Sequence, residues 1–199
     1  MGRTSDAKEK LMEAAVELIW AGSYGGTSVD DICERAGVRK GSFYHFFQSK
    51  SELAVAGLGS CWKEHLEELD HIFSPIHPPL ERLRKVCAKI VEEQREAYEK
   101  HGRVLGCPVH SLGAEVSTWE DALQMKIQEA IAQHHRYFES ALRDAASEGL
   151  IPAIPDPAVR ARIASAYCEG LMMHARILND LSVLDAMADG VLMIARMGP

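Results

Sequence analysis

The 199-residue sequence predicts an all-α protein of about nine helices, and it contains no convincing strand. Apolar residues recur at the spacing of an amphipathic helix along nearly the whole chain, as Leu11, Ala15 and Leu18 do near its start. Glycine and proline gather at a few points, where they end one helix and separate it from the next. We therefore expect an N-terminal helical head over residues 1–50 and a larger helical domain over residues 51–199.

The first two helices are marked by residues that start and stop helices. A helix that begins near Thr4 or Ser5 is expected to end at the glycines that start with Gly22. Ser28 then caps a second helix, and Asp31 stands where a side chain returns a hydrogen bond to the capping residue. A short glycine-rich loop should therefore join the two helices.

The third helix is short and carries aromatic residues. Gly37 provides the turn that precedes it, and it is expected over residues 40–47. Phe43 and Phe47 lie four residues apart, so they face the same side of this helix. We expect the pair to pack against the first two helices in a small core, which would hold the third helix on a rigid support.

Caps and prolines set the remaining boundaries. Ser49 opens a long fourth helix, and Asp156 caps the eighth, whose first residue is Pro157. Ser117 or Thr118 is expected to cap the seventh helix. The helices after the third are expected over residues 49–73, 80–100, from 108 onward, 119–147, 157–178 and 181–197.

Charge is distributed unevenly along the chain. The net charge is −7, yet residues 1–50 hold seven of the 22 Lys and Arg and seven of the 29 Asp and Glu. The stretch over residues 35–51, RAGVRKGSFYHFFQSKS, has no acidic residue at all. A basic and aromatic segment in an acidic protein indicates a surface that meets a polyanion, whereas the acidic remainder would be repelled by phosphate.

Bulk composition excludes several other classes of protein. No apolar run approaches the roughly 20 residues that a membrane-spanning helix needs. The N-terminal segment MGRTSDAKEK has no apolar core of a signal peptide. Five scattered cysteines without CxxC spacing fit free thiols in a reducing compartment. We expect a cytoplasmic protein with no membrane association.

The segment TSVDDICERAGVRKGSFYHFFQSKSEL resembles the helix-turn-helix signature of TetR-type bacterial repressors, and the match spans roughly residues 8–54. The resemblance implies a homodimer with a three-helix DNA-binding head, and a C-terminal domain that binds a small-molecule inducer. It assigns Tyr44 and Lys50 chiefly to phosphate, with His45 nearby. Independently of the resemblance, the face opposite Phe43 should present polar side chains to the major groove of an operator. The expected DNA-binding residues are Thr27, Ser28, Arg39, Lys40, Gly41, Ser42, Tyr44, His45 and Lys50.

The last two helices are expected to form the dimer interface, because small and apolar residues on one stripe permit close packing across a two-fold axis. The alternative is that both stripes pack within one subunit. The stripes are Ala161, Ala164, Cys168, Leu171 and Ala175 in the eighth helix, and Leu181, Leu184, Ala188, Val191 and Ala195 in the last.

Large adaptable side chains between residues 61 and 178 suit an apolar cavity with a few orienting polar groups, although such stripes also serve as ordinary core. Cys107 is the most specific candidate, since it precedes Pro108 at a helix start that favours a thiolate. It is either an inert thiol or one that reacts with a quinone or aldehyde, as the Gly-Cys-Pro element of some electrophile-responsive TetR-type repressors suggests by resemblance. The expected ligand-binding residues are Cys107, His110, Trp119, Phe138, Tyr167, Met172 and His174.

Two other classes of function remain open. Cys107 and His110 could serve as nucleophile and base of a thiol enzyme, but no orienting acid or oxyanion loop is evident. A helical partner protein that has lost DNA binding is the other alternative, which the presence of Tyr44, Lys50 and the glycine turn disfavours. We expect no cofactor and no metal, because His134 and His135 point about 100° apart on a helix and no metal-binding motif accompanies them.

Overall fold

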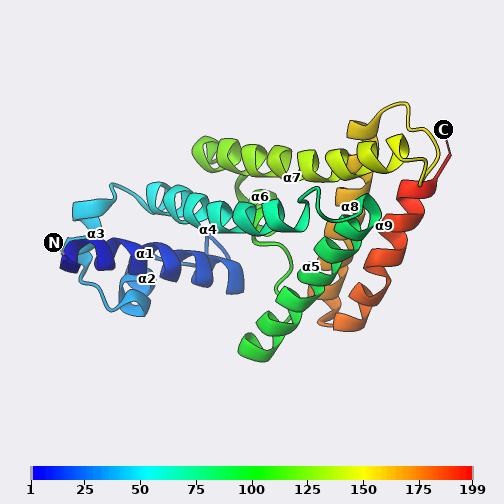
Figure 1. The fold of residues 1–199 in the computed structure, drawn as a ribbon. Coiled ribbons are helices and arrows are strands. Elements are labelled where there is room, and N and C mark those ends of the chain that lie inside the picture. The colour runs from blue at the N-terminus through cyan, green and yellow to red at the C-terminus, as the bar shows by residue number, and fades with distance from the viewer. Residues whose placement is uncertain (1, 199) are drawn as a thin grey trace. The chain divides into compact units, whose positions relative to one another are not determined.

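The computed structural model describes residues 2–198, with side chains from Asp6 onward. These residues form nine α-helices, one 3-10 helix and no strand, which confirms the all-α prediction (Figure 1). The elements are α1 (Gly2–Ala21), α2 (Val29–Ala36), α3 (Lys40–Phe46), α4 (Lys50–Ile72), α5 (Pro79–His101), α6 (Pro108–Val116), α7 (Asp121–Ser147), α8 (Pro157–Leu178), η1 (Leu181–Ala186) and α9 (Met187–Arg196).

Two boundaries differ from the sequence prediction for a local reason. Helix α7 begins at Asp121 because the Ser117 hydroxyl, expected to cap it, donates instead to the carbonyl oxygen of Gly113 at the end of α6. The final helix is divided into η1 and α9, with Asp180 accepting a hydrogen bond from the Ser182 amide at the start of η1. The capping residue thus fixes a tight turn of 3-10 helix before the α-helix begins.

The chain divides into two compact units. The first contains the residues up to His65 together with Pro108–Ala130, and the second contains Leu66–Cys107 with the residues from Ile131 onward. Helices α4 and α7 each contribute to both units. This division differs from the one expected at residue 50, because α6 and the start of α7 join the N-terminal helices. The expected domain boundary itself stays a prediction.

The N-terminal helices of the first unit enclose a small apolar cluster. Helices α1, α2 and α3 surround Phe43, which is fully buried, and Phe47, which is nearly so (Figure 1). Their rings lie 6.0 Å apart between centroids, as the four-residue spacing predicts. The buried members are Leu11, Ala14, Ala15, Ile32, Cys33, Phe43, Phe47 and Leu53.

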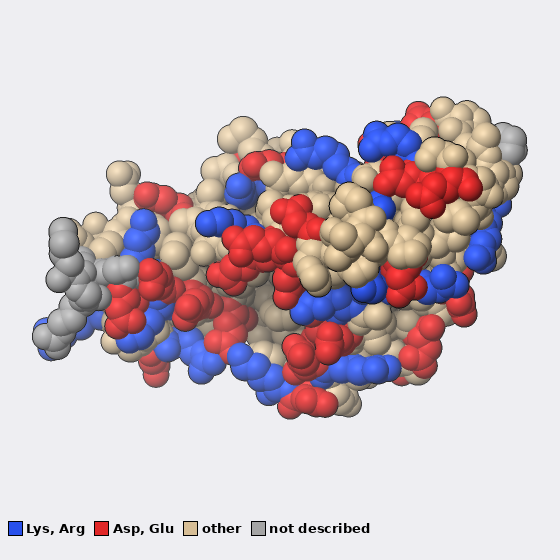
Figure 2. Space-filling view, in the orientation of Figure 1, with Lys and Arg blue, Asp and Glu red and all other residues tan. Residues whose placement is uncertain are grey.

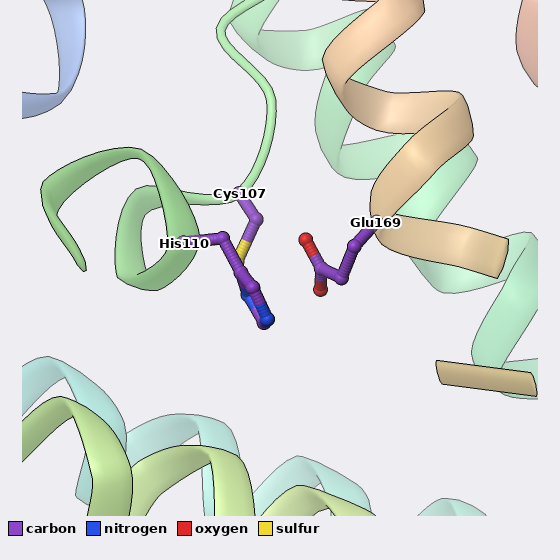
Figure 3. Close-up of side chains that lie close together, drawn as sticks. All are labelled: Cys107, His110 and Glu169. Atoms are coloured by element: carbon purple, nitrogen blue, oxygen red, sulfur yellow. The ribbon is translucent and has the colours of Figure 1, made fainter. Parts of the chain in front are cut away.

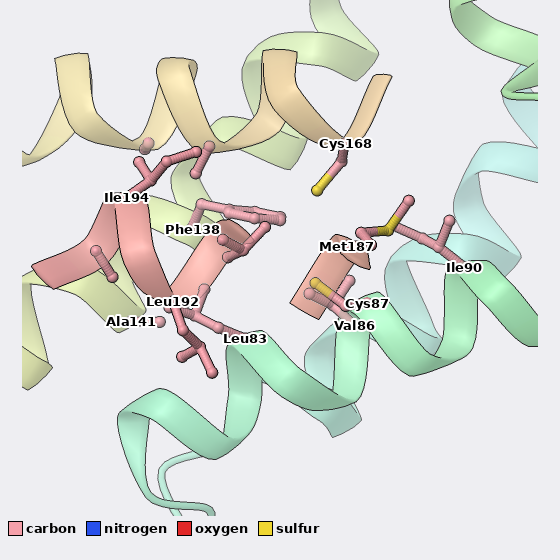
Figure 4. Close-up of a cluster of buried hydrophobic side chains, with 14 of the residues drawn as sticks. Leu83, Val86, Cys87, Ile90, Phe138, Ala141, Cys168, Met187, Leu192 and Ile194 are labelled. Carbon is pink, nitrogen blue, oxygen red and sulfur yellow. The ribbon is translucent and has the colours of Figure 1, made fainter. Parts of the chain in front are cut away.

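The second unit has a larger core in which α5, α8 and α9 lie side by side with η1 (Figure 1). Phe138 of α7 is fully buried there, and Figure 4 shows it among side chains from α5, α8 and α9. Cys87 and Cys168 are both buried in this cluster. Close packing of this kind leaves few voids, so the core resists deformation.

The stripes expected to form a dimer interface are part of this core, so that assignment was wrong. Ala161, Ala164 and Cys168 are at most 1% exposed within a single chain. Helix α8 places a different set of side chains on its surface, at the spacing of one helix face. These exposed residues are Val159, Ile163, Ala166, Gly170, Met173 and Ile177.

No helix within residues 2–198 combines the length and the apolar character that crossing a lipid bilayer demands.

Candidate DNA-binding surface and thiol site

The turn between α2 and α3 is defined by local hydrogen bonds. At the start of α2, the Asp31 amide donates to the Ser28 hydroxyl, and the Asp31 carboxylate accepts from the Ser28 amide, which confirms the predicted capping box. Gly37 ends α2 with a φ of 64°, a left-handed conformation that glycine adopts without steric cost. The capping box thus fixes the start of α2, and Gly37 forms the turn that leads into α3.

Helix α3 has one buried face and one exposed face. Phe43 is fully buried, while the adjacent Tyr44 is 57% exposed and packs edge-on against the Phe43 ring. His45 and Gly41 are exposed as well, and a Cβ added to Gly41 would meet nothing within 4 Å. The polar face is therefore open to a ligand as large as a nucleic-acid groove, on a helix held by its aromatic core.

The cations around α3 are not all equally available. Lys40 pairs with Asp30 at 2.7 Å, and Arg35 pairs with Glu17 at 2.6 Å. Among the described residues, Arg39 is exposed and forms no ion pair. Figure 2 shows Lys and Arg side chains lying among Asp and Glu side chains over the visible face. The basic segment is therefore partly neutralised by acidic residues from α1 and α2, which its sequence alone does not contain.

Lys50 and Thr27 have partners inside the loop between α1 and α2. The Lys50 ammonium donates to the carbonyl oxygens of Tyr24, at 2.7 Å, and Thr27, at 2.8 Å. The Thr27 hydroxyl donates to the carbonyl oxygen of Ser23, and Thr27 is only 6% exposed. Both side chains therefore shape the loop, and their direct contact with DNA stays a prediction.

In the second unit, the segment of chain before Cys107 is held by side chains of α5 and α8. The amide of Gln94 both accepts from and donates to the backbone of Gly106, at 2.7 and 3.2 Å. Arg176 donates to the Leu105 carbonyl oxygen at 2.8 Å. The Val104 amide donates to the Asn179 side chain at 3.0 Å. Cys107 thus follows a segment whose backbone is fixed by side chains from two neighbouring helices.

Cys107 is half-buried, and its side chain hydrogen-bonds to the carboxyl group of Glu169 on α8. Figure 3 shows the thiol and this carboxyl group turned toward each other. Burial raises the pKa of Glu169 to about 7, although the hydrogen bond from Cys107 acts in the opposite direction. Near neutral pH this carboxyl group can therefore either accept or supply a proton beside the thiol.

Comparisons with known proteins match both parts of the chain. The family model described as "Bacterial regulatory proteins, tetR family" matches residues 11–56, and the model described as "Tetracyclin repressor-like, C-terminal domain" matches residues 79–191. The second match alone covers more than half of the sequence. The chain belongs to the TetR family.

Individual relatives of this TetR-family protein match over most of their length. An uncharacterized HTH-type transcriptional regulator of Lactococcus lactis is 29% identical, over 92% of this chain and 90% of the relative. The transcriptional regulator AcuR of Cereibacter sphaeroides is 28% identical, over 86% and 77%. The crystal structure of the reduced form of E. coli NemR superposes with a TM-score of 0.81 at 19% identity, over 94% of this chain and 96% of that one. These matches show the fold of a regulator with a helix-turn-helix DNA-binding domain.

The residues expected to bind a ligand in this TetR-family protein lie in different surroundings. Phe138 and Met172 are core residues, and His174 is exposed on α8. Tyr167 hydrogen-bonds the carbonyl oxygen of Ala186. Trp119 and His110 belong to the first compact unit, and the other five belong to the second.

A groove of about 510 Å³ on the second unit involves none of the expected ligand-binding residues. It is lined by Arg84, Asp189, Leu192, Met193, Arg196 and Met197. The set of expected ligand-binding residues therefore stays a prediction. The fold of the second unit brings one of them, Cys107, next to Glu169.

Sequence reasoning did not foresee two contacts that the structure shows. Glu169 lies 62 positions after Cys107, and no spacing rule connects them. Glu115 of α6 accepts hydrogen bonds from the amides of Tyr24 and Gly25 in the head. For Glu115, the sequence shows only an acidic residue on the solvent side of a short amphipathic helix. Such residues are common on helical surfaces.

Proposed function

We propose that this TetR-family protein is a repressor that binds a palindromic operator as a homodimer and is released by a small apolar or electrophilic inducer. The observation that carries the DNA-binding part is α3, which buries Phe43 and leaves Tyr44 and His45 open to solvent. A helix fixed on its inner face and bare on its outer face is the element that such proteins insert into the major groove. Arg39 adds an exposed cation beside it.

The dimer is supported by the exposed face of α8. Ile163 is 49% exposed and Ile177 is 71% exposed, on one helix face with the small residues Ala166 and Gly170. A Cβ added to Gly170 would meet nothing within 4 Å, so another helix can approach closely there. A second copy of the same face would cover these apolar groups by two-fold symmetry. Two heads reading two half-sites would then give useful sequence specificity.

Cys107 is the proposed point of contact with an electrophilic inducer. Its thiol would add across the conjugated double bond of a quinone, forming a carbon–sulfur bond, while the thiol proton passes to the adduct. Glu169 can carry that proton, because burial raises its pKa to about 7. The E. coli NemR crystal structure is that of a reduced form, and E. coli NemR is named an HTH-type transcriptional repressor. The first description agrees with a regulator that can be reduced, and the second with a repressor.

A selection experiment tests the proposal. The purified protein would be used to enrich binding sites from a random DNA library, and we expect two inverted half-sites about one helical turn apart. p-Benzoquinone should then release the operator from the wild type and from Cys61→Ser, which removes the exposed thiol, but not from Cys107→Ser. No enrichment over Tyr44→Ala would refute the DNA-binding part, and equal release from Cys107→Ser would remove the thiol from the mechanism.

The alternative of a thiol enzyme is tested with the same protein. A nucleophilic Cys107 that turns over would hydrolyse a model thioester repeatedly, whereas an inducer site would form at most one adduct per thiol. We propose regulation, because catalysis at Cys107 would not explain the exposed polar face of α3. Multiple turnovers without operator binding would favour the enzyme instead.

A further inference from the structure

The loop between α1 and α2 is anchored to α6 by a single carboxylate. Within the first compact unit, the amides of Tyr24 and Gly25 donate to the two carboxylate oxygens of Glu115, at 2.8 and 2.6 Å. Hydrogen bonds from two successive amides to an ionised carboxylate are charge-assisted and stronger than bonds between neutral groups. Glu115 therefore fixes both the position and the orientation of this loop.

Tyr24 is buried and contacts several elements of the same unit. It is 4% exposed, and its ring lies 5.7 Å from that of Trp119. Its hydroxyl group hydrogen-bonds with Ser51 and Glu120, and burial together with the Glu120 charge raises the pKa of the phenol. The Tyr24 carbonyl oxygen accepts from Lys50 at the start of α4. Tyr24 thus joins α6, the start of α7 and the start of α4.

The backbone of Glu115 is also held by a hydrogen bond. Its backbone carbonyl oxygen accepts a hydrogen bond from the Trp119 indole at 2.9 Å. It is the last but one residue of α6, which begins at Pro108, directly after Cys107.

The loop in turn sets up the DNA-binding elements. Thr27 accepts a hydrogen bond from Lys50, and the next residue, Ser28, is the cap of α2. If the amides of Tyr24 and Gly25 lost their acceptor, the segment that leads into α2 would lose its anchor to α6. The amide groups would then be satisfied by water, in a less defined loop conformation.

We propose that Glu115 is a positioning residue of the DNA-binding head, because its carboxylate anchors the loop that leads to the start of α2. This inference rests on the proposed function, because operator binding is its readout. Glu115 lies far outside the N-terminal family match over residues 11–56, so the head includes a residue that its own signature does not contain.

Three substitutions alter the contact, two at Glu115 and one at Gly25. Glu115→Ala removes the acceptor, and Glu115→Gln keeps one neutral acceptor oxygen. Gly25→Ala leaves the carboxylate in place but adds a Cβ that would lie 3.1 Å from Glu115 Oε1, which forces the side chain to move. The matched control is Glu129→Gln, which removes one negative charge from α7 in the same unit.

The test measures operator affinity of the full-length variants at several salt concentrations. We expect Glu115→Ala to weaken binding about 10-fold, and Glu115→Gln and Gly25→Ala about threefold each. The slope of log K against log salt should stay unchanged, because no phosphate contact is lost. The double variant Glu115→Ala/Gly25→Ala should bind no more weakly than Glu115→Ala, since both changes break one contact. Circular dichroism and a melting curve would establish that each variant is folded.

A local readout separates positioning from a general loss of stability. Hydrogen exchange followed by mass spectrometry should be faster in the loop between α1 and α2 of Glu115→Ala than in the wild type, and unchanged in α5 and α8. Wild-type affinity in both Glu115→Ala and Gly25→Ala would overturn the positioning role. Unchanged exchange in the loop of Glu115→Ala would overturn it as well. Failure of the wild type to bind any operator would instead refute the proposed function.

Discussion

The ammonium group of Lys50 lies 4.1 Å from the centre of the Tyr24 ring and donates to the carbonyl oxygens of Tyr24 and Thr27. A cation over an aromatic face adds to the two hydrogen bonds, so three interactions hold this side chain in the loop. The family resemblance assigns Lys50 to phosphate. In the structure the same residue supports the loop that leads to the start of α2, which changes what its substitution is expected to do.

Lys50→Ala should weaken binding to operator DNA and to random-sequence DNA alike, by about 1 kcal/mol. Because its donors already serve the loop, the salt dependence of binding should remain close to that of the wild type. Arg39→Ala, which removes an exposed cation beside α3, should instead lower the salt slope by about one. Titrations by fluorescence anisotropy at four salt concentrations measure both quantities. A reduced slope in Lys50→Ala would place its ammonium on phosphate after all.

Asp30→Asn should strengthen DNA binding by about threefold to 10-fold. The Asp30 carboxylate accepts a hydrogen bond from Lys40 and raises the pKa of the Lys40 ammonium. Removing this charge frees Lys40 for phosphate and abolishes a repulsion next to α3. Glu148→Gln changes the net charge equally, on an exposed residue of the second unit, and should leave the affinity unaltered. Equal gains in the two variants would mean that net charge alone is responsible.

Stability of the second unit should fall as pH rises from about 5 to 8. Burial raises the pKa of both Glu93 and Glu169 from 4.5 to about 7. The unfolded chain therefore releases these protons at a lower pH than the folded chain does, so ionisation between the two pKa values favours unfolding. Glu169→Gln and Glu93→Gln should each recover about 1–3 kcal/mol at pH 8 and little at pH 5.

Urea unfolding at the two pH values measures these differences. Exposed Glu148 provides a control substitution to Gln that should show no pH-dependent gain. If Glu169→Gln and the wild type differed by the same amount at pH 5 and pH 8, the ionisation of Glu169 would have no part in the pH dependence.

A charge on the exposed face of α8 should separate the proposed dimer into monomers. Ile163→Glu and Ile177→Glu place carboxylates where two copies would bury apolar groups, and an unpaired buried charge is costly. We expect the dimer dissociation constant to rise at least about 10-fold. Leu150→Glu, an exposed apolar residue in the connection between α7 and α8, is the control. Sedimentation velocity at micromolar concentration gives the result, and a dimer in both α8 variants would place the interface elsewhere.

Local signals in the sequence predict the helices well. The Ser28 and Asp31 capping box, the turn at Gly37 and the inward pair Phe43 and Phe47 all appear where the pattern places them. Each depends on residues within a few positions of one another, so the sequence contains the whole interaction. The predicted start of α7 was wrong. The Ser117 hydroxyl could either cap α7 or bond back to α6, and it donates to Gly113 of α6.

Long-range partners could not be predicted in the same way. An apolar stripe on α8 fits a core and a dimer interface equally well, and packing against α9 decides in favour of the core. The bonds from Tyr24 and Gly25 to Glu115 join a glycine-rich loop to a helix some 90 residues away. Neither end carries a periodic signal, since loop conformation and helix placement are set by the tertiary fold.

The buried thiols give each compact unit its own reporter of local opening. Cys33 lies in the apolar cluster of the first unit, whereas Cys87 and Cys168 touch each other inside the core of the second. A thiol reagent can reach these sulfur atoms only when the surrounding helices separate. The rates at which the intact protein becomes labelled at Cys33 and at Cys168 would therefore give two separate opening free energies. Comparing these values with and without DNA would reveal which unit the operator stabilises.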